Sequence, residues 1–137
     1  MPSEVTGRLE VAHAQLKDEH RRLMTLLDRL RAAEHGTGVE RLLEELHTTL
    51  IDHFSHEQFP GGFYEIMGAH DSTHHGELQE LVKEHCMILS VVVDLLEKVR
   101  MPGQRADLVD GIASLVAQLD AHEQKEHDLA HKLLNET

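Results

Sequence analysis

Two pairs of residues in this sequence combine an imidazole with a carboxylate four positions apart, His53 with Glu57 and His122 with Glu126. On an α-helix this spacing puts both side chains on one face, where both can reach the same metal ion. A histidine-rich chain produces such pairs by chance, so the pairs alone decide little. Their chemical meaning depends on where they fall in the helices that carry them.

The composition predicts an all-helical protein of one domain. Leu, Ala, Glu, Lys and Arg dominate the 137 residues, while aromatic residues make up 3% and Trp is absent, which favours helices over strands. Breakers at 35–38, 60–62, 68–72 and 102–103 separate four periodic segments. We expect helices over 5–34, 38–59, 72–100 and 104–134, with a further turn over 63–67.

The order of these segments predicts an all-α, up-down-up-down antiparallel four-helix bundle, because the first and third connections are short. Thr37 with Glu40 forms a capping box for the second helix, and Asp71 or Ser72 can cap the third. Stepping alternately four and three residues gives one inner stripe per helix, over 9–30, 39–57, 74–99 and 108–133. The stripes are apolar except at a few positions, which are almost all His or Glu.

The polar positions on the stripes are predicted to lie at one height in the bundle. Counted from the first turn, His20 lies about 15 residues before it and His53 about 17 residues after it. Counted from the turn at 102–103, which joins the third and fourth predicted helices, His85 lies about 16 residues before it and His122 about 20 residues after it. Ionisable side chains in a helical core are costly unless they pair with one another or bind a metal. We therefore expect one layer of six metal ligands, or of buried polar residues bonded to one another: His20, His53, Glu57, His85, His122 and Glu126.

The segments DEHRRLM, HFSHE, KEHCMIL and HEQKE, in this order, resemble the hemerythrin-like, or HHE cation-binding, domain family. The resemblance extends over residues 9–134 and describes the chain 1–137 as a single domain of that kind. It implies a non-haem centre of two iron ions with an oxo or hydroxo bridge. His20 and His53 would hold one iron, His85 and His122 the other, and Glu57 and Glu126 would bridge. Imidazole and carboxylate ligands suit iron, with manganese or zinc as substitutes.

One position departs from the oxygen-carrying hemerythrins, which have a His-x-x-x-His pair in the third helix. Four residues before His85 this chain has Leu81. The second iron is then expected to have fewer protein ligands, which leaves room for water, peroxide or another small molecule. Tyr64 and His74 are candidates to fill the gap. An alternative third-helix pair, His70 with His74, lies too low in the bundle to be preferred.

The other histidines and the single cysteine are expected to have structural roles. His13, one heptad below His20, is predicted to be a satisfied core or bundle-end histidine rather than an accessory ligand or proton relay. Cys86 cannot form an internal disulfide, and we expect it to be a buried, inert side chain rather than a redox sensor. The remaining histidines are expected on the solvated surface: His35, His47, His56, His75, His127 and His131.

Charge and hydropathy limit the classes of partner. A net charge of -12 argues against nucleic acid and anionic lipid surfaces. The longest nearly apolar run, 86–96, is too short to span a bilayer and contains Asp94, and the segment MPSEVTGRLE has no apolar signal-peptide core. We expect a cytoplasmic protein with no membrane partner.

The function predicted from these residues is a protein that binds or senses O2, NO or a related small ligand at the metal site. Apolar side chains at Leu16, Leu23, Leu50, Leu81 and Ile88 would wall the site and keep it dry. Two alternatives stay open at this point. One is an enzyme of the peroxidase or catalase type acting on hydrogen peroxide, and the other is iron storage or delivery. The sequence identifies no protein partner.

Overall fold

The structure, a computed structural model, describes residues 4–33, 38–70, 72–103 and 105–135. Four long helices dominate it: α1 (Glu4–Ala33), α2 (Val39–Gln58), α4 (His75–Val99) and α5 (Arg105–Asn135). Between α2 and α4 lie the short helix α3 (Phe63–His70) and a 3-10 turn, η1 (Ser72–His74). The described residues include no strand, so the predicted all-α class is confirmed.

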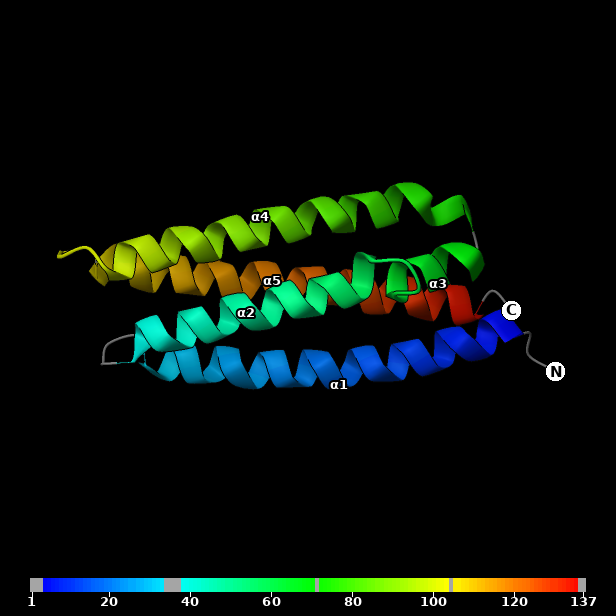
Figure 1. Ribbon diagram of the computed structural model, residues 1–137, viewed down its shortest axis with the longest axis horizontal. Helices are drawn as coiled ribbons and strands as arrows, with labels where there is room; N and C mark the ends of the chain where they lie inside the picture. The colour runs from blue at the N-terminus through cyan, green and yellow to red at the C-terminus, as the bar shows by residue number, and fades with distance from the viewer. Residues whose placement is uncertain (1–3, 34–37, 71, 104, 136–137) are drawn as a thin grey trace.

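The four long helices lie side by side in a bundle (Figure 1). α1 packs against α2 and α5, and α4 packs against the same two helices, so α1 and α4 are diagonal to one another. The end of α1 and the start of α2 lie at the end of the bundle away from the two termini, as do the end of α4 and the start of α5 (Figure 1). α3 lies at the opposite end, against α1.

The helix boundaries follow the sequence prediction closely, with two differences. The third predicted helix begins late, because Ser72 belongs to the 3-10 turn and His74 occupies the N-cap position of α4 without a side-chain cap bond. The predicted turn over 63–67 is a full helix of eight residues, α3. The expected caps Thr37 and Asp71 lie outside the described residues.

The predicted inner stripes form the core. Every stripe position is buried except Val99, which is half-buried. The apolar side chains divide into two clusters, one toward the α1–α2 and α4–α5 connections and one toward the termini and α3. On α1, α4 and α5 the predicted ligand positions fall between these clusters; on α1, for example, His20 lies between Leu16 and Leu23. On α2, the two predicted ligands lie near the end of the helix, after Leu50 of the first cluster. The bundle therefore holds a polar layer between two apolar ones.

The turn between α2 and α3 brings a tyrosine into that layer. The N–H of Phe59 donates to the carbonyl of Ser55 at 3.1 Å, where α2 ends. A side chain at Gly62 would overlap the carbonyl oxygens of His56, Glu57 and Phe59, so the chain can turn back this tightly only with glycine there. α3 then buries Tyr64 against the polar layer.

None of the described helices combines the length and the apolar character that crossing a membrane requires.

Candidate metal centre

The six predicted ligand residues come together in the polar layer and are buried. Their side chains form two groups of four, and in each group the potential ligand atoms lie within 4.8 Å of one another. Both groups contain Glu57 and Glu126; one adds His20 and His53, and the other adds His85 and His122. We call these the first and the second histidine pair. The six residues thus form two adjoining donor groups that share the carboxylates of Glu57 and Glu126.

Glu57 directs one carboxylate oxygen to each histidine pair. Its Oε2 atom lies 3.5 Å from Nε2 of His53 and 4.0 Å from Nε2 of His20. Its Oε1 atom lies 3.1 Å from Nε2 of His85. A carboxylate placed in this way can bind two metal ions, one through each oxygen.

Glu126 has the same arrangement from the opposite helix. Its Oε1 atom lies 3.1 Å from Nε2 of His20, and its Oε2 atom lies 3.7 Å from Nε2 of His122. Oε2 also accepts a hydrogen bond of 2.6 Å from the hydroxyl of Tyr64. The same hydroxyl lies 2.8 Å from Nε2 of His85. Tyr64 therefore lies beside the second histidine pair, for which the sequence predicted a missing ligand because Leu81 stands four residues before His85.

Two of the four histidines form a hydrogen bond to a glutamate through Nδ1, the ring nitrogen on the side away from the shared carboxylates. Nδ1 of His53 donates to Glu19 at 3.1 Å, and Nδ1 of His122 donates to Glu84 at 2.8 Å. A carboxylate at Nδ1 fixes the proton there and leaves Nε2 as the atom with a free lone pair. Both Nε2 atoms point into the layer, as metal ligands would.

The other two histidines are held by the residue that follows each shared glutamate. Nδ1 of His85 donates to Oε1 of Gln58 at 2.6 Å. Nδ1 of His20 lies 2.8 Å from Nε2 of His127, whose own Nδ1 lies 3.0 Å from Nε2 of His13. If Nδ1 of His20 donates to His127 and Nδ1 of His127 donates to His13, both contacts in this row of three imidazoles are hydrogen bonds. The expectation that His127 lies on the solvated surface is wrong, because it is half-buried and bonded to His20 and His13 of α1.

The layer contains buried polar atoms that face one another without a hydrogen bond between them. Within the described part of the chain, no hydrogen bond is made by Nε2 of His20, His53 and His122, by either oxygen of Glu57, or by Oε1 of Glu126. Lone pairs that converge at 3.1 to 4.0 Å repel one another unless a cation lies between them. Metal ions fit this donor set better than hydrogen bonding alone does.

Burial shifts the ionisation of these groups in the metal-free chain. Burial, with the Glu126 carboxylate beside it, raises the pKa of Glu57 well above its usual range. Burial and the neighbouring His122 lower the pKa of His85 to about 3. Burial raises the pKa of Glu123, next to His122, to about 8, with Glu126 adding to the rise. Uncharged imidazoles and crowded carboxylates are the forms that a divalent cation would stabilise.

The two candidates for the additional ligand are placed differently. The hydroxyl of Tyr64 reaches the layer, as described above. His74 is buried near the start of α4, where its Nδ1 donates to Glu77 at 2.9 Å, and it belongs to neither donor group. His70 is the last residue of α3 and His74 lies in η1, so the alternative His70 and His74 pair does not share one helix.

The remaining sequence predictions have mixed outcomes. His13 is buried and bonded to His127, as expected for a satisfied histidine. Cys86 is exposed, so its predicted burial is wrong: it follows the inward-facing His85 and lies about 100° further around the helix. The exposed histidines are His56, His75 and His131, while His47 is half-buried and His35 lies outside the described residues.

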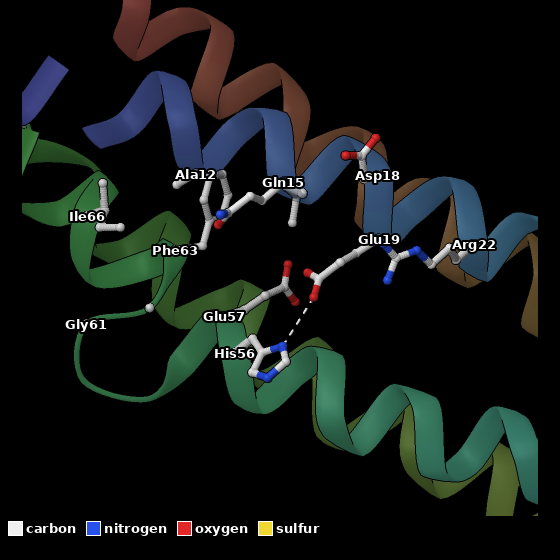
Figure 2. A pocket seen from close by; sticks show the side chains of 12 residues that line it. Ala12, Gln15, Asp18, Glu19, Arg22, His56, Glu57, Gly61, Phe63 and Ile66 are labelled. Carbon is white, nitrogen blue, oxygen red and sulfur yellow. Dashed lines mark hydrogen bonds and ion pairs between the residues drawn. The ribbon is translucent and has the colours of Figure 1, made fainter. Parts of the chain in front are cut away.

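A cavity of about 380 Å³ opens beside Glu57, between α1, the end of α2 and the start of α3 (Figure 2). Phe63 and Ile66 form an apolar wall, and Asp18, Glu19 and His56 supply polar atoms. Figure 2 shows the carboxylates of Glu19 and Glu57 directed toward the same part of the cavity. The cavity therefore reaches Glu57 of the buried layer, beside the glutamate that bonds to His53.

Comparisons with protein-family models, with curated protein sequences and with solved structures each find no match for this chain. The chemistry of the layer is therefore inferred from its geometry.

Sequence reasoning missed the residues that hold the histidines from behind, although they follow a rule. Glu19 and Glu84 each precede a layer histidine and bond to the histidine of the next helix. Gln58 and His127 each follow a shared glutamate and bond to a histidine of the other hairpin. The repeated Glu-His dipeptides at 19–20 and 84–85 were the available signal.

Proposed function

We propose that this chain is a hemerythrin-like protein that holds two iron ions in its polar layer and binds O2, NO, peroxide or a related small ligand there. The observation that carries the proposal is that Glu57 and Glu126 are shared by two donor groups, with one oxygen toward each histidine pair. The long helices then form an up-down-up-down antiparallel bundle. His20 and His53 hold one ion, His85 and His122 hold the other, and the glutamates bridge.

The donor chemistry supports iron, with manganese or zinc as substitutes, because imidazole and carboxylate are mixed in equal numbers in each group. Bound iron would supply the redox-active centre and the affinity for a diatomic ligand or peroxide. The chain supplies orientation: Glu19, Glu84 and Gln58 fix the Nδ1 protons, so that the Nε2 atoms are ready to bind.

Apolar walls support binding of a small, weakly polar ligand. The side chains expected to enclose the site, Leu16, Leu23, Leu50, Leu81 and Ile88, are all buried and belong to the two apolar clusters that flank the layer. Such walls exclude bulk water and strengthen the electrostatic interactions inside the layer.

The position of the Tyr64 hydroxyl bears on which of the two proposed ions has a free coordination position for an added ligand. Its hydroxyl lies beside the second histidine pair, so we assign Tyr64 as an additional ligand or as a hydrogen-bond donor on that side. No tyrosine hydroxyl contacts the first pair among the described residues, and two residues bonded or close to it, Glu19 and Glu57, line the cavity. The exchangeable position then belongs to the first pair, and not to the second as Leu81 alone would indicate.

Elemental analysis of the chain purified from iron-supplemented cells tests the proposal. We expect about two iron ions per folded chain and an optical spectrum that changes on exposure to air. A folded chain that contains no iron, and takes up none when it is added anaerobically, would contradict the proposal.

A peroxidase or catalase activity is the second candidate, and the cavity beside Glu57 favours it because turnover requires substrate and product to exchange. Addition of many equivalents of peroxide to the iron-loaded chain separates the two functions. Continued consumption supports the enzyme, whereas reaction with a single equivalent leaves the binding function.

A further inference from the structure

The cavity in Figure 2 ends on the carboxylate of Glu57. The Glu57 side chain lines the cavity, is 1% exposed, and makes no hydrogen bond through either oxygen within the described part of the chain. Carboxylate oxygens that no hydrogen bond occupies are available to an incoming cation, and the attraction between them is weakly screened at a buried position.

His56 and Glu19 line the cavity together with Glu57, and Asp52 lies beside His56, one turn earlier on α2. Asp52 and His56 lie at the outside with side chains 75% and 60% exposed, and Oδ1 of Asp52 lies 3.7 Å from Nε2 of His56. Two donor atoms this far apart can share one ion at bond lengths of about 2.1 Å. Nδ1 of His56 donates to Oε1 of Glu19 at 3.2 Å, and Glu19, at 30% exposure, lines the same cavity as Glu57.

The other hairpin has a different arrangement at the matching positions. His56 is three residues after the layer histidine His53, and the residue three after His122 is Lys125. The Lys125 ammonium forms an ion pair with Glu84, the counterpart of Glu19. The ammonium beside Glu84 repels a divalent cation, whereas a neutral imidazole beside Glu19 can bind one. At this pair of positions, His56 and Lys125, the charge pattern favours metal passage beside Glu19 over passage beside Glu84.

We propose that the cavity beside Glu57 is the route by which divalent metal ions reach the polar layer. Asp52 and His56 are the outer site where an ion first binds, and Glu19 passes it to Glu57. This inference rests on the proposed function, since it requires metal in the layer, but it concerns the rate of loading and not the final content.

The test measures the rate at which the metal-free chain takes up Co²⁺, followed by the visible absorbance of the protein-bound ion. His56→Lys introduces the ammonium group found at Lys125, and Asp52→Ala removes the carboxylate of the proposed outer site. Each is expected to slow uptake about tenfold at low salt, with unchanged final cobalt content. His75→Lys is the matched control, because it makes the same change at an exposed histidine outside the cavity.

Arg22 gives a change of opposite sign, because it lines the cavity and repels cations. Arg22→Gln is expected to accelerate uptake, and higher ionic strength is expected to slow uptake by the unmodified chain. Loading of the His56→Lys and Asp52→Ala variants at the rate of the His75→Lys control would overturn the inference. In that case cobalt would still fill the layer and the proposed function would stand, whereas a chain that binds no cobalt contradicts both.

Discussion

The two hairpins of the bundle place the same kinds of group at matching positions, yet they surround the layer differently. In the α1–α2 hairpin, Glu19 holds His53, and in the α4–α5 hairpin, Glu84 holds His122. The shared glutamates, Glu57 and Glu126, occupy equivalent places four residues after a layer histidine. This symmetry explains how one Glu-His dipeptide and one His-x-x-x-Glu pattern from each hairpin build two donor groups that share two carboxylates.

The differences lie in the residues around this common frame. Tyr64 stands beside the second histidine pair, and the cavity opens beside the first. The residue after His53 is Phe54, which stacks on His85 with ring centroids 3.8 Å apart, whereas the residue after His122 is Glu123, a buried acid. The comparison teaches that two hairpins with the same donor groups can give the two halves of one layer unequal surroundings, and the proposed ligand position depends on this inequality.

Removal of both shared carboxylates should have the largest effect, because both donor groups depend on them. The Glu57→Ala and Glu126→Ala double variant is expected to lose both ions while the helical content, followed by circular dichroism, is retained. Glu80→Ala with Glu97→Ala, at exposed positions of α4, is the matched control. Iron content equal to that of the control would refute the bridging assignment.

Replacement of Tyr64 should affect the second histidine pair alone. Tyr64→Phe keeps the ring but removes the hydroxyl that contacts Glu126 and His85, so we expect about tenfold or more weaker binding of one ion. A metal titration of the metal-free chain that resolves two affinities measures this. Equal weakening of both would show that the two halves do not act separately.

The glutamates behind the histidines should have matching effects in the two hairpins. Glu19→Gln and Glu84→Gln each keep a hydrogen-bond acceptor for Nδ1 but remove the negative charge that increases the basicity of the imidazole. Each is expected to weaken the binding of one ion about tenfold. The same titration applied to the double variant should show both losses together; loss at one ion only would break the symmetry.

The smallest expected effect concerns Glu123 in the metal-free chain. Because burial raises its folded pKa from 4.5 to about 8, the folded chain retains a proton that the unfolded chain releases, and stability falls as pH rises through this window. Glu123→Gln should therefore raise the free energy of unfolding by about 1 kcal/mol or more at pH 8 relative to pH 5, measured by urea denaturation. A gain that does not depend on pH would contradict this cause.

The sequence predicted the inner stripes and the layer positions with few errors, because both depend on helical periodicity and on the cost of burying polar groups. His20 and His85 could be placed at one height simply by counting residues from the turns. Cys86 was misplaced because the prediction used the general tendency of free cysteines to be buried and not the angular position of this residue on the helix. Its exposure follows from the same periodicity that buries His85.

By itself, then, the sequence determined which side chains face inward, since local spacing along a helix fixes their direction whatever the partner helix is. Tertiary structure alone decided which group lies behind each histidine, because Glu19, Gln58 and His127 reach their partners across helix interfaces. It also decided that Tyr64 enters the layer, since that depends on how the tight turn at Gly62 directs α3. Contacts between elements depend on packing distances and angles that no single helix encodes.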